Sequence, residues 1–440
     1  MKRHIPKSIK RLLKPLQAYC LYKLDKYSQD RSLLRVQKDL MLGKKIKVVF
    51  LVIHRSVWKV DTVFRRMQND DLFDPEILVC PNIKASSTEL EAELESTYNF
   101  FESKNYKVSK SRKANGEWLR LDELAPHIIF FTNPYKLTLT EYYESAFKNY
   151  LSCYVPYYFM ATEHAGKLSD LLNTRMLNAM WRIYWPHKYV YDEYAKWSTC
   201  KGKNGRLSGY PAVERLYDHP RTHRELERSV WRKVGDTKKR IIYAPHHSIE
   251  NSAKSLSSFL IFGKLLRDIS ARYKNEIQWA FKPHPLLKEK LYNHPDWGQR
   301  KTEEYYSYWE NNDNSQVELG EYEKLFIESD ALIHDCSSFI VEYAFLEKPA
   351  LFLKKTELSE DNFLNEFGKI AFKSHQIAES EEEVISFILE LLEPTQISRK
   401  FCQKDFDSYT SEFYSNNSPS REIINDIKSA LANRKAINYE

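Results

Sequence analysis

Short, continuous runs of apolar residues alternate along the chain with segments in which apolar residues recur at helical spacing. The runs lack the alternation of apolar and polar residues that marks a half-exposed strand, so they predict buried parallel strands. In the first half of the chain, these runs cover residues 46–53, 76–80, 127–131 and 153–159. Helices are predicted between them, near 57–69 and 87–102, and strands that alternate with helices indicate a doubly wound α/β domain.

A second series of the same kind follows a polar, glycine-containing stretch at 198–209. Its apolar runs cover residues 240–244, 277–281, 330–335 and 350–353. The sequence therefore predicts two Rossmann-like doubly wound domains that face a cleft. We expect an N-terminal and a C-terminal α/β domain. The expected borders are 1–45 for an N-terminal extension, 46–215 and 216–395 for the domains, and 396–440 for a helical tail with Ser420 as a helix N-cap.

The N-terminal extension is basic, and its apolar residues recur at helical spacing over residues 8–24. Residues 1–47 hold 14 Lys and Arg side chains and only three Asp, while the whole chain carries +7, so the remainder is net acidic. A basic amphipathic helix can lie on an anionic membrane surface. The alternative is a helix packed on the acidic body of the same chain. No run of about 18 apolar residues predicts a membrane span.

Composition excludes several classes of protein. Glycine is scarce, 11 of 440 residues, and neither G-x-G-x-x-G nor G-x-x-x-x-G-K-[ST] occurs, so no glycine-rich loop is expected to hold a phosphate. The six cysteines are scattered without a C-x-x-C pair, which favours reduced thiols in the cytoplasm and no zinc site or disulfides. Because the basic charge is confined to one end and no nucleic-acid-binding signature appears, we expect no nucleic-acid partner. No cofactor and no metal are expected.

One strand end in the second domain predicts an anion site. The apolar run at 330–335 ends at Asp335, and Ser337 and Ser338 then open an apolar helical segment. Backbone N–H groups and hydroxyls at a helix start favour a phosphate or diphosphate. The alternative is simple N-capping, which stabilises a helix by ~1 kcal/mol. Glu342 lies one turn further along, where it is expected to bind ribose hydroxyls or else to be solvated.

Two other strand ends carry residues of matching chemistry. His246 and His247 follow the first strand of the second domain, and Lys282 and His284 lie between prolines after the next. The prolines restrict the backbone, so a cation and an imidazole are held in place beside the expected diphosphate; a rigid turn with an incidental histidine is the alternative. In the first domain, His164 follows a strand and is a candidate base for an acceptor hydroxyl, or a structural histidine.

Taken in order, these motifs resemble the CDP-glycerol glycerophosphotransferase family. The resemblance runs from about residue 155 to 390, and the segments that carry it are Glu163-His164-Ala165-Gly166, Gly209-Tyr210-Pro211, Tyr243-Ala244-Pro245, His284-Pro285-Leu286, Asp335-Cys336-Ser337-Ser338 and Lys348-Pro349-Ala350. The chain departs from the family pattern at Ala165, at residues 212–214, at His246-His247, at Cys336 and at Glu342. These departures fall near the donor headgroup and the acceptor, so the resemblance leaves glycerol phosphate itself open.

The resemblance implies a GT-B-like transferase, with the N-terminal α/β domain on the acceptor side and the C-terminal α/β domain binding the nucleotide donor. It would move a glycerol- or ribitol-phosphate group from a CDP-activated donor to a hydroxyl of a cell-surface polysaccharide or teichoic-acid-like acceptor and release CMP. The enzyme would work in cell-envelope or capsule synthesis, peripherally on the inner face of the cell membrane, with residues 1–45 on the anionic surface. The alternative is a GT-B glycosyltransferase with a nucleotide-sugar donor in capsule or lipopolysaccharide synthesis. The implied catalytic residues are His164 and His284, and the implied donor-binding residues are Lys282, Ser337, Ser338, Glu342, Asp335, His246 and His247.

Overall fold

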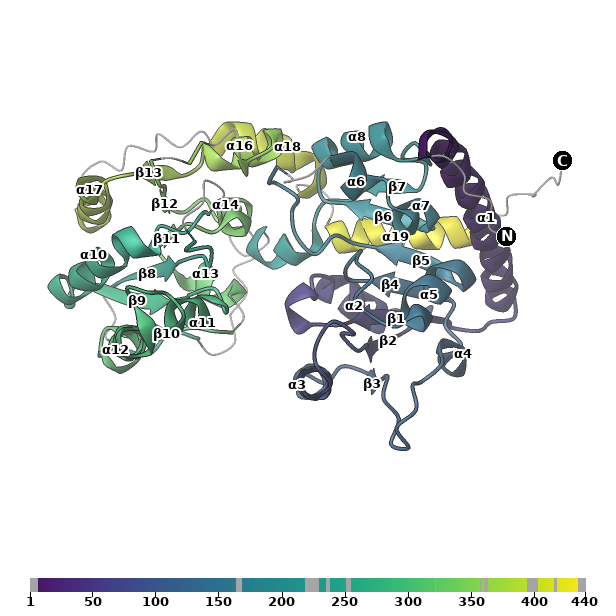
Figure 1. Cartoon of the computed structure of the whole chain (residues 1–440), viewed down its shortest axis with the longest axis horizontal. Helices are drawn as coiled ribbons and strands as arrows, with labels where there is room; N and C mark the ends of the chain where they lie inside the picture. Colours follow the sequence, from purple (N-terminus) through teal and green to yellow (C-terminus); the bar gives the residue numbers. More distant parts are fainter. Residues whose placement is uncertain are drawn as a thin grey trace. The chain divides into compact units, whose positions relative to one another are not determined.

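The computed structural model divides the chain into two compact units (Figure 1). It describes residues 7–163, 168–217, 229–234, 238–250, 255–320, 322–356, 358–359, 363–393, 403–414 and 418–433. The first unit comprises residues 1–160, 164–212 and 413–440, and the second comprises residues 161–163 and 213–412. The domain borders expected from the sequence stay predictions; in the structure, the division of the α/β core falls at 212/213, and the N-terminal helix and the last segment belong to the first unit.

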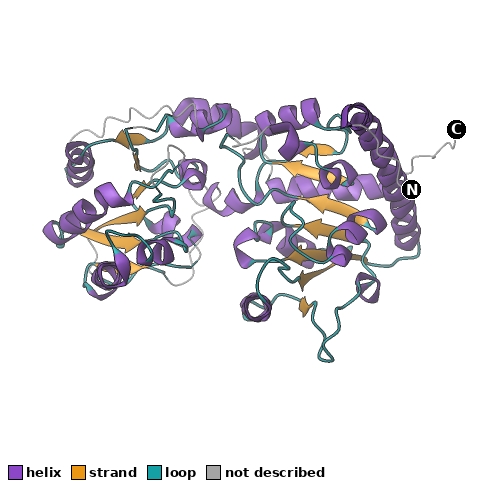
Figure 2. Cartoon of the chain, viewed as in Figure 1, coloured by secondary structure: helices purple, strands orange, loops and turns teal. Residues whose placement is uncertain are grey.

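The first unit is built on a seven-stranded parallel sheet with the order β3-β2-β1-β4-β5-β6-β7. Its strands are labelled in Figure 1 and drawn in orange in Figure 2. Its strands are β1 (Ile46–Val52), β2 (Phe73–Val79), β3 (Val108–Lys110), β4 (Ile128–Phe131), β5 (Leu151–Tyr154), β6 (Arg182–Trp185) and β7 (Gly205–Leu207). Its helices are α1 (Lys7–Met41), α2 (Asp61–Gln68), α3 (Ser87–Glu102), α4 (Leu121–Leu124), α5 (Glu144–Asn149), α6 (Leu168–Leu172), α7 (Arg175–Ala179), α8 (Lys188–Trp197) and α19 (Pro419–Ala432). The strands β1, β2, β4 and β5 are almost wholly buried, as the apolar runs predict.

Helix α1 packs on the first unit through its C-terminal half, where it contacts α5, α7 and α19. The buried amide of Gln29 donates to the carbonyls of Phe147 (2.6 Å) and Tyr150 (2.9 Å). Asp25 is also buried and forms a bidentate ion pair with Arg175, both N–O distances being 2.9 Å. The helix predicted over residues 8–24 is therefore confirmed and is longer than expected, because its second half is fixed by these polar contacts.

The described side chains in the N-terminal half of α1 are largely exposed to solvent. Leu13, Leu16 and Tyr19 are 46%, 60% and 48% exposed, and Lys14 and Lys23 are exposed beside them. This part of the helix therefore presents apolar and basic side chains to solvent. Within the described part of the chain, no helix has both the length and the apolar character needed to cross a bilayer.

Helix α19 closes the first unit and corrects one expectation. It begins at Pro419, its N-cap is Ser418, and Ser420 is buried in the first turn, where its hydroxyl accepts from Arg66 Nε at 2.6 Å. Ser420 is therefore not the N-cap, because proline is well suited to the first helical position and sets the start of the helix two residues earlier than predicted. Asp426 in the same helix pairs with Arg182, from β6, at 2.8 Å.

The second unit is built on a six-stranded parallel sheet with the order β10-β9-β8-β11-β12-β13. Its strands are β8 (Lys239–Ala244), β9 (Ile277–Phe281), β10 (Ser315–Val317), β11 (Ala331–His334), β12 (Ala350–Leu353) and β13 (Gln376–Ala378). Its helices are α10 (Phe259–Arg272), α11 (Leu287–Tyr292), α12 (Gly298–Asn311), α13 (Glu323–Glu328), α14 (Ser337–Ala344), α16 (Glu366–Phe372), α17 (Glu381–Leu392) and α18 (Gln403–Tyr414). The prediction of two doubly wound parallel sheets is confirmed, while the cleft between them stays a prediction.

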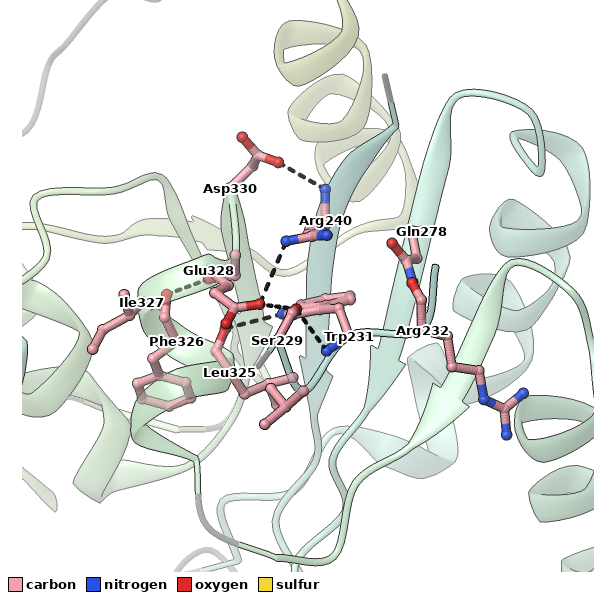
Figure 3. A network of polar contacts seen from close by, with 12 residues as sticks. Ser229, Trp231, Arg232, Arg240, Gln278, Leu325, Phe326, Ile327, Glu328 and Asp330 are labelled. Atoms are coloured by element: carbon pink, nitrogen blue, oxygen red, sulfur yellow. Dashed lines mark hydrogen bonds and ion pairs between the residues drawn. The ribbon is translucent and has the colours of Figure 1, made fainter. Parts of the chain in front are cut away.

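A polar network fixes the amino-terminal edge of the second sheet (Figure 3). The Arg240 backbone N–H, at the start of β8, donates to Asp330 (2.8 Å), and its guanidinium lies 3.5 Å from the Glu328 carboxylate. The same guanidinium lies over the ring of Trp231, 5.6 Å from its centroid, and the Trp231 indole N–H donates to the carbonyl of Leu325. The network holds β8 and β11 in register, so the loops at their opposite ends start from fixed positions.

Candidate active site at the carboxyl ends of the second sheet

The three loops singled out in the sequence leave three neighbouring strands. Ala244 at the end of β8 pairs with His334 at the end of β11, and Tyr243 pairs with Phe281 at the end of β9. All three strands are parallel, so the loops that follow them meet at one edge of the sheet. The strand order reverses between β8 and β11, and open parallel sheets bind ligands at such a switch point.

Three histidines from two of these loops form one cluster. The ring centroids of His246 and His247 lie 4.3 Å apart, those of His247 and His284 4.2 Å, and those of His246 and His284 5.3 Å. His246 and His247 follow β8, and His284 follows β9, so strand pairing brings together residues that are distant in the sequence. These three side chains are called the histidine cluster below.

The cluster is neutral at physiological pH. Burial lowers the pKa of His246 to about 3 and that of His284 to about 4, with the neighbouring histidine and lysine charges adding to the shift. Burial also lowers the pKa of His247. Neutral imidazoles can accept a proton or bind a metal ion, but they supply no positive charge to an anion until they are protonated.

Asp335 ties two backbone segments together beneath the cluster. Its buried carboxylate accepts the backbone N–H of His246 and, at 2.7 Å, the backbone N–H of Ser258 at the start of α10. Burial raises the pKa of Asp335 to about 6, and these hydrogen bonds partly oppose that shift. Asp335 is wholly buried in the structure, and its predicted direct contact with the donor stays a prediction.

The start of α14 lies beside this clamp. Cys336 occupies the N-cap position and makes no side-chain cap bond, while Ser337 and Ser338 are the first two helical residues. Ser338 is exposed and Ser337 is partly exposed. No side chain caps the first N–H groups of this helix, and a helix start of this kind can hold an anion; the predicted anion site at Ser337 and Ser338 stays a prediction. The alternative, in which Ser337 or Ser338 caps the helix, is wrong, because Cys336 occupies the N-cap position.

Lys282 and Glu342 are both held inside the second unit. The Lys282 ammonium donates to the carbonyl of Gly320 at 2.9 Å and lies 5.6 Å from the ring centroid of Tyr322. Its side chain is only 9% exposed, so its charge is little screened by water. Glu342 is 4% exposed, which excludes the solvated glutamate considered as the alternative. Its expected contact with ribose stays a prediction.

His164, the expected base, lies outside the described residues. The segment directly before it belongs to the second unit: Thr162 pairs with Leu364, and the Glu163 N–H donates to the carbonyl of Phe363 at 2.9 Å. Gly368 packs under this segment so closely that a Cβ there would lie 2.1 Å from the carbonyl oxygen of Ala161. The backbone that leads into His164 is therefore fixed by contacts that include a required glycine.

A cavity of about 310 Å³ opens next to the histidine cluster. It lies between the same two loops and is lined by Ile249, Glu250, Leu286, Glu289, Lys290, Asn293, His294 and Pro295. None of the nine residues predicted to bind or react lines it. Sequence reasoning also missed Tyr322 and Gly368, because an aromatic ring or a glycine carries no local signal of the side chain or backbone it will pack against.

A protein-family model matches the family that the sequence motifs resemble. The family model described as CDP-glycerol:poly(glycerophosphate) glycerophosphotransferase matches residues 177–427, more than half of the chain. This match includes the three strand-end loops and excludes α1. No curated protein matches the chain in sequence.

Solved structures share the fold at low sequence identity. MnaA of S. aureus in complex with UDP has a TM-score of 0.54 at 16% identity, covering 90% of this chain and all of the other. A variant of the wall teichoic acid polymerase TagF has a TM-score of 0.54 at 14% identity, covering 92% and 97%. The UDP-GlcNAc 2-epimerase of Neisseria meningitidis, bound to UDP-GlcNAc, has a TM-score of 0.51 at 14% identity, covering 89% and 100%. These similarities establish the GT-B-like fold.

Proposed function

The chain belongs to the CDP-glycerol:poly(glycerophosphate) glycerophosphotransferase family, and from this premise we propose that it transfers a polyol phosphate from a CDP-linked donor to a hydroxyl of a cell-envelope polymer. The polymer is of the teichoic-acid or capsule type. The observation that carries the proposal is the meeting of three strand-end loops at the switch point of the second sheet, inside the matched residues. Each loop brings groups suited to a diphosphate.

The proposed reaction is a displacement at the phosphorus that carries the polyol. The acceptor hydroxyl oxygen attacks this phosphorus, the bond from phosphorus to the bridging oxygen breaks, and CMP leaves with the electron pair of that bond. The acceptor proton passes to His164, the proposed base. No redox partner is required, and the bond formed replaces the bond broken. Such a reaction is accelerated mainly by positioning and by stabilisation of charge.

The residues of the second unit would act on the diphosphate. Lys282 supplies a fixed positive charge that is nearly buried. Ser337 and Ser338 add hydroxyls at the positive end of α14. In the metal-free protein, His284 begins neutral and becomes a charged hydrogen-bond donor when an anion arrives, because a nearby negative charge raises a histidine pKa. Glu342 is proposed to accept hydrogen bonds from the ribose.

The acceptor is proposed to be presented at a membrane. The exposed leucines and lysines in the first half of α1 suit the interface of an anionic bilayer on its cytoplasmic side. The second half of α1 packs on the first unit, so the helix would hold the enzyme at the surface without spanning it.

Nucleotide preference tests the choice of donor. Thermal unfolding is measured with CMP, CDP, UDP and GDP at equal concentrations, since a ligand that binds only the native state raises the midpoint. The proposal predicts the largest rise with the cytidine nucleotides. A larger rise with UDP or GDP would support the alternative, a glycosyltransferase with a nucleotide-sugar donor, and would contradict the CDP-linked donor.

A further inference from the structure

We propose that the histidine cluster binds a divalent transition-metal ion, with Zn²⁺ as the best fit. Ligand nitrogens of His246, His247 and His284 all lie within 4.8 Å of one another. In the described part of the chain, no other group of His, Cys, Asp or Glu meets the same distance criterion. The sequence predicts no metal site, because the third histidine lies on a different strand end and only strand pairing brings it to the other two.

Coordination would displace few hydrogen bonds of the three imidazole rings. The Nδ1 atom of His247 is buried and has no hydrogen-bond partner among the described residues. The Nδ1 atom of His246 lies 2.8 Å from Ser248 Oγ and accepts the Ser248 backbone N–H at 3.2 Å. Coordination through Nε2 therefore requires Nδ1 to give up this backbone bond and to donate to the hydroxyl instead. His284 would give up one long hydrogen bond, since its Nδ1 accepts from the Leu286 N–H at 3.2 Å.

The geometry needs only a local adjustment. Zn–N bonds of 2.0–2.1 Å in a tetrahedral site place ligand nitrogens roughly 3.3 Å apart. The rings are already in contact, with centroids 4.2 to 5.3 Å apart, and they sit on loops beyond the strand ends. The Asp335 carboxylate holds the His246 backbone in place. Side-chain rotations at fixed backbone positions therefore close the site.

Three protein ligands leave a coordination position open. Imidazoles suit Zn²⁺ and its neighbours, and a site of three histidines with an open fourth position is typical of zinc sites that bind water or substrate. Lys290, whose charge lowers the pKa of all three histidines, is paired with Glu250, which offsets its repulsion of a cation. Lys282 also acts on His284, but its ammonium donates to the carbonyl of Gly320. The open position would take a water molecule or a phosphate oxygen. Ion binding itself does not depend on the proposed function; only the use of the ion against a donor diphosphate rests on it.

Metal titration of the untagged full chain, after treatment with a chelator, tests the site. Zn²⁺ binding is measured by calorimetry, and Co²⁺ binding by the visible absorption of low-symmetry cobalt. We expect about one ion per chain, and each of His246→Ala, His247→Ala and His284→Ala should weaken binding by about a hundredfold or more. His294→Gln, a histidine of the same unit outside the cluster, is the matched control and should bind like the wild type.

The metal site would be contradicted if the wild type bound no ion, or if all three alanine variants still bound it. It would also be contradicted if His294→Gln lost as much metal affinity as the cluster variants. Circular dichroism checks that each variant is folded, and His247→Gln and His284→Gln replace any alanine variant that is not. Turnover of a CDP-linked donor is measured on the chelator-treated protein in parallel. Turnover without ion binding contradicts the metal site alone, and ion binding without turnover of any CDP-linked donor contradicts the proposed function alone.

Discussion

The carboxylate of Asp335 accepts the backbone N–H of His246, and this bond crosses the point at which the strand order of the second sheet reverses. Asp335 follows β11 and His246 follows β8, so one side chain joins the loops that carry the serines and the histidines. Its second bond, to the Ser258 N–H, includes the start of α10. A buried carboxylate with two backbone donors fixes the site before any ligand arrives.

Ionisation of Asp335 should lower stability as the pH rises. Burial raises the pKa of Asp335 in the folded chain to about 6 from an ordinary value of 3.8. Between these pH values the folded chain binds more protons than the unfolded chain, so the unfolding free energy falls with increasing pH by on the order of 3 kcal/mol. Asp335→Asn cannot ionise. Relative to this variant, the wild type should lose stability between about pH 4 and pH 6 in urea unfolding.

The exposed Asp268→Asn is the matched control for this experiment. Its unfolding free energy should follow the wild type across the same pH range. A constant difference between wild type and Asp335→Asn from pH 4 to pH 7 would mean that Asp335 does not ionise in this range.

Ser337→Ala and Ser338→Ala should affect donor binding more than folding. Neither serine occupies the N-cap of α14, and no side-chain cap bond is present there. Stability should therefore change by less than about 0.5 kcal/mol. A lost hydrogen bond to a charged phosphate should raise the KM for the donor roughly tenfold. Steady-state kinetics and thermal unfolding separate the two effects.

Ser380→Ala provides the comparison for these two variants. The Ser380 hydroxyl caps α17 by accepting the Glu383 N–H at 3.3 Å, so its loss should cost ~1 kcal/mol of stability with unchanged KM. If Ser337→Ala and Ser338→Ala behaved like Ser380→Ala, the serines would be helix caps and not an anion site.

Binding of CDP to the metal-free, chelator-treated protein should take up protons through His284. Its pKa in the free enzyme is about 4, lowered mainly by burial, so the imidazole is neutral at pH 6. A bound diphosphate raises this pKa, and the histidine then takes a proton from solvent. Calorimetry at pH 6 in buffers of different ionisation enthalpy should report this uptake, and CDP affinity should increase as the pH falls. In His284→Gln, the proton uptake of the enzyme should be lost and only that of the bound nucleotide should remain. Equal proton uptake by the wild type and His284→Gln would contradict protonation of His284.

The first half of α1 should carry membrane binding. Leu13→Ser combined with Leu16→Ser removes two exposed apolar side chains that do not pack on the first unit. Binding to vesicles that contain anionic lipid should fall at least ~10-fold in sedimentation assays, with an unchanged unfolding midpoint. Leu389→Ser, at an exposed leucine of α17, is the control. An equal loss of vesicle binding in the control, or no loss in the double variant, would exclude α1 as the membrane-binding segment. Truncation at residue 45 is a poorer test, since it also removes the buried Gln29.

The buried strands were predictable from the sequence because each is a continuous apolar run. The predicted strands at 277–281 and 350–353 are β9 and β12 with the same bounds. The edge strands β3, β7, β10 and β13 were missed, because each has only three residues and leaves little apolar pattern. The strand β6 was also missed, although three of its four residues are buried. The strand predicted at 153–159 ends at Tyr154 in the structure.

The loops of the candidate site were also predictable, since parallel strands end at one edge. The clustering of their side chains was not. His284 reaches His247 because β9 pairs with β8, a pairing that no local pattern encodes. The structural role of Asp335 was likewise hidden, because its two partners are backbone N–H groups from distant segments.

The most direct test of the account is mass spectrometry of the products formed from CDP-glycerol, CDP-ribitol and UDP-sugars with a teichoic-acid-like acceptor. The account predicts CMP as a product and an acceptor extended by one or more polyol phosphates, with turnover reduced at least ~10² in His284→Ala while the variant stays folded. Release of UDP with a sugar added to the acceptor, and no reaction with either CDP-linked donor, would contradict it.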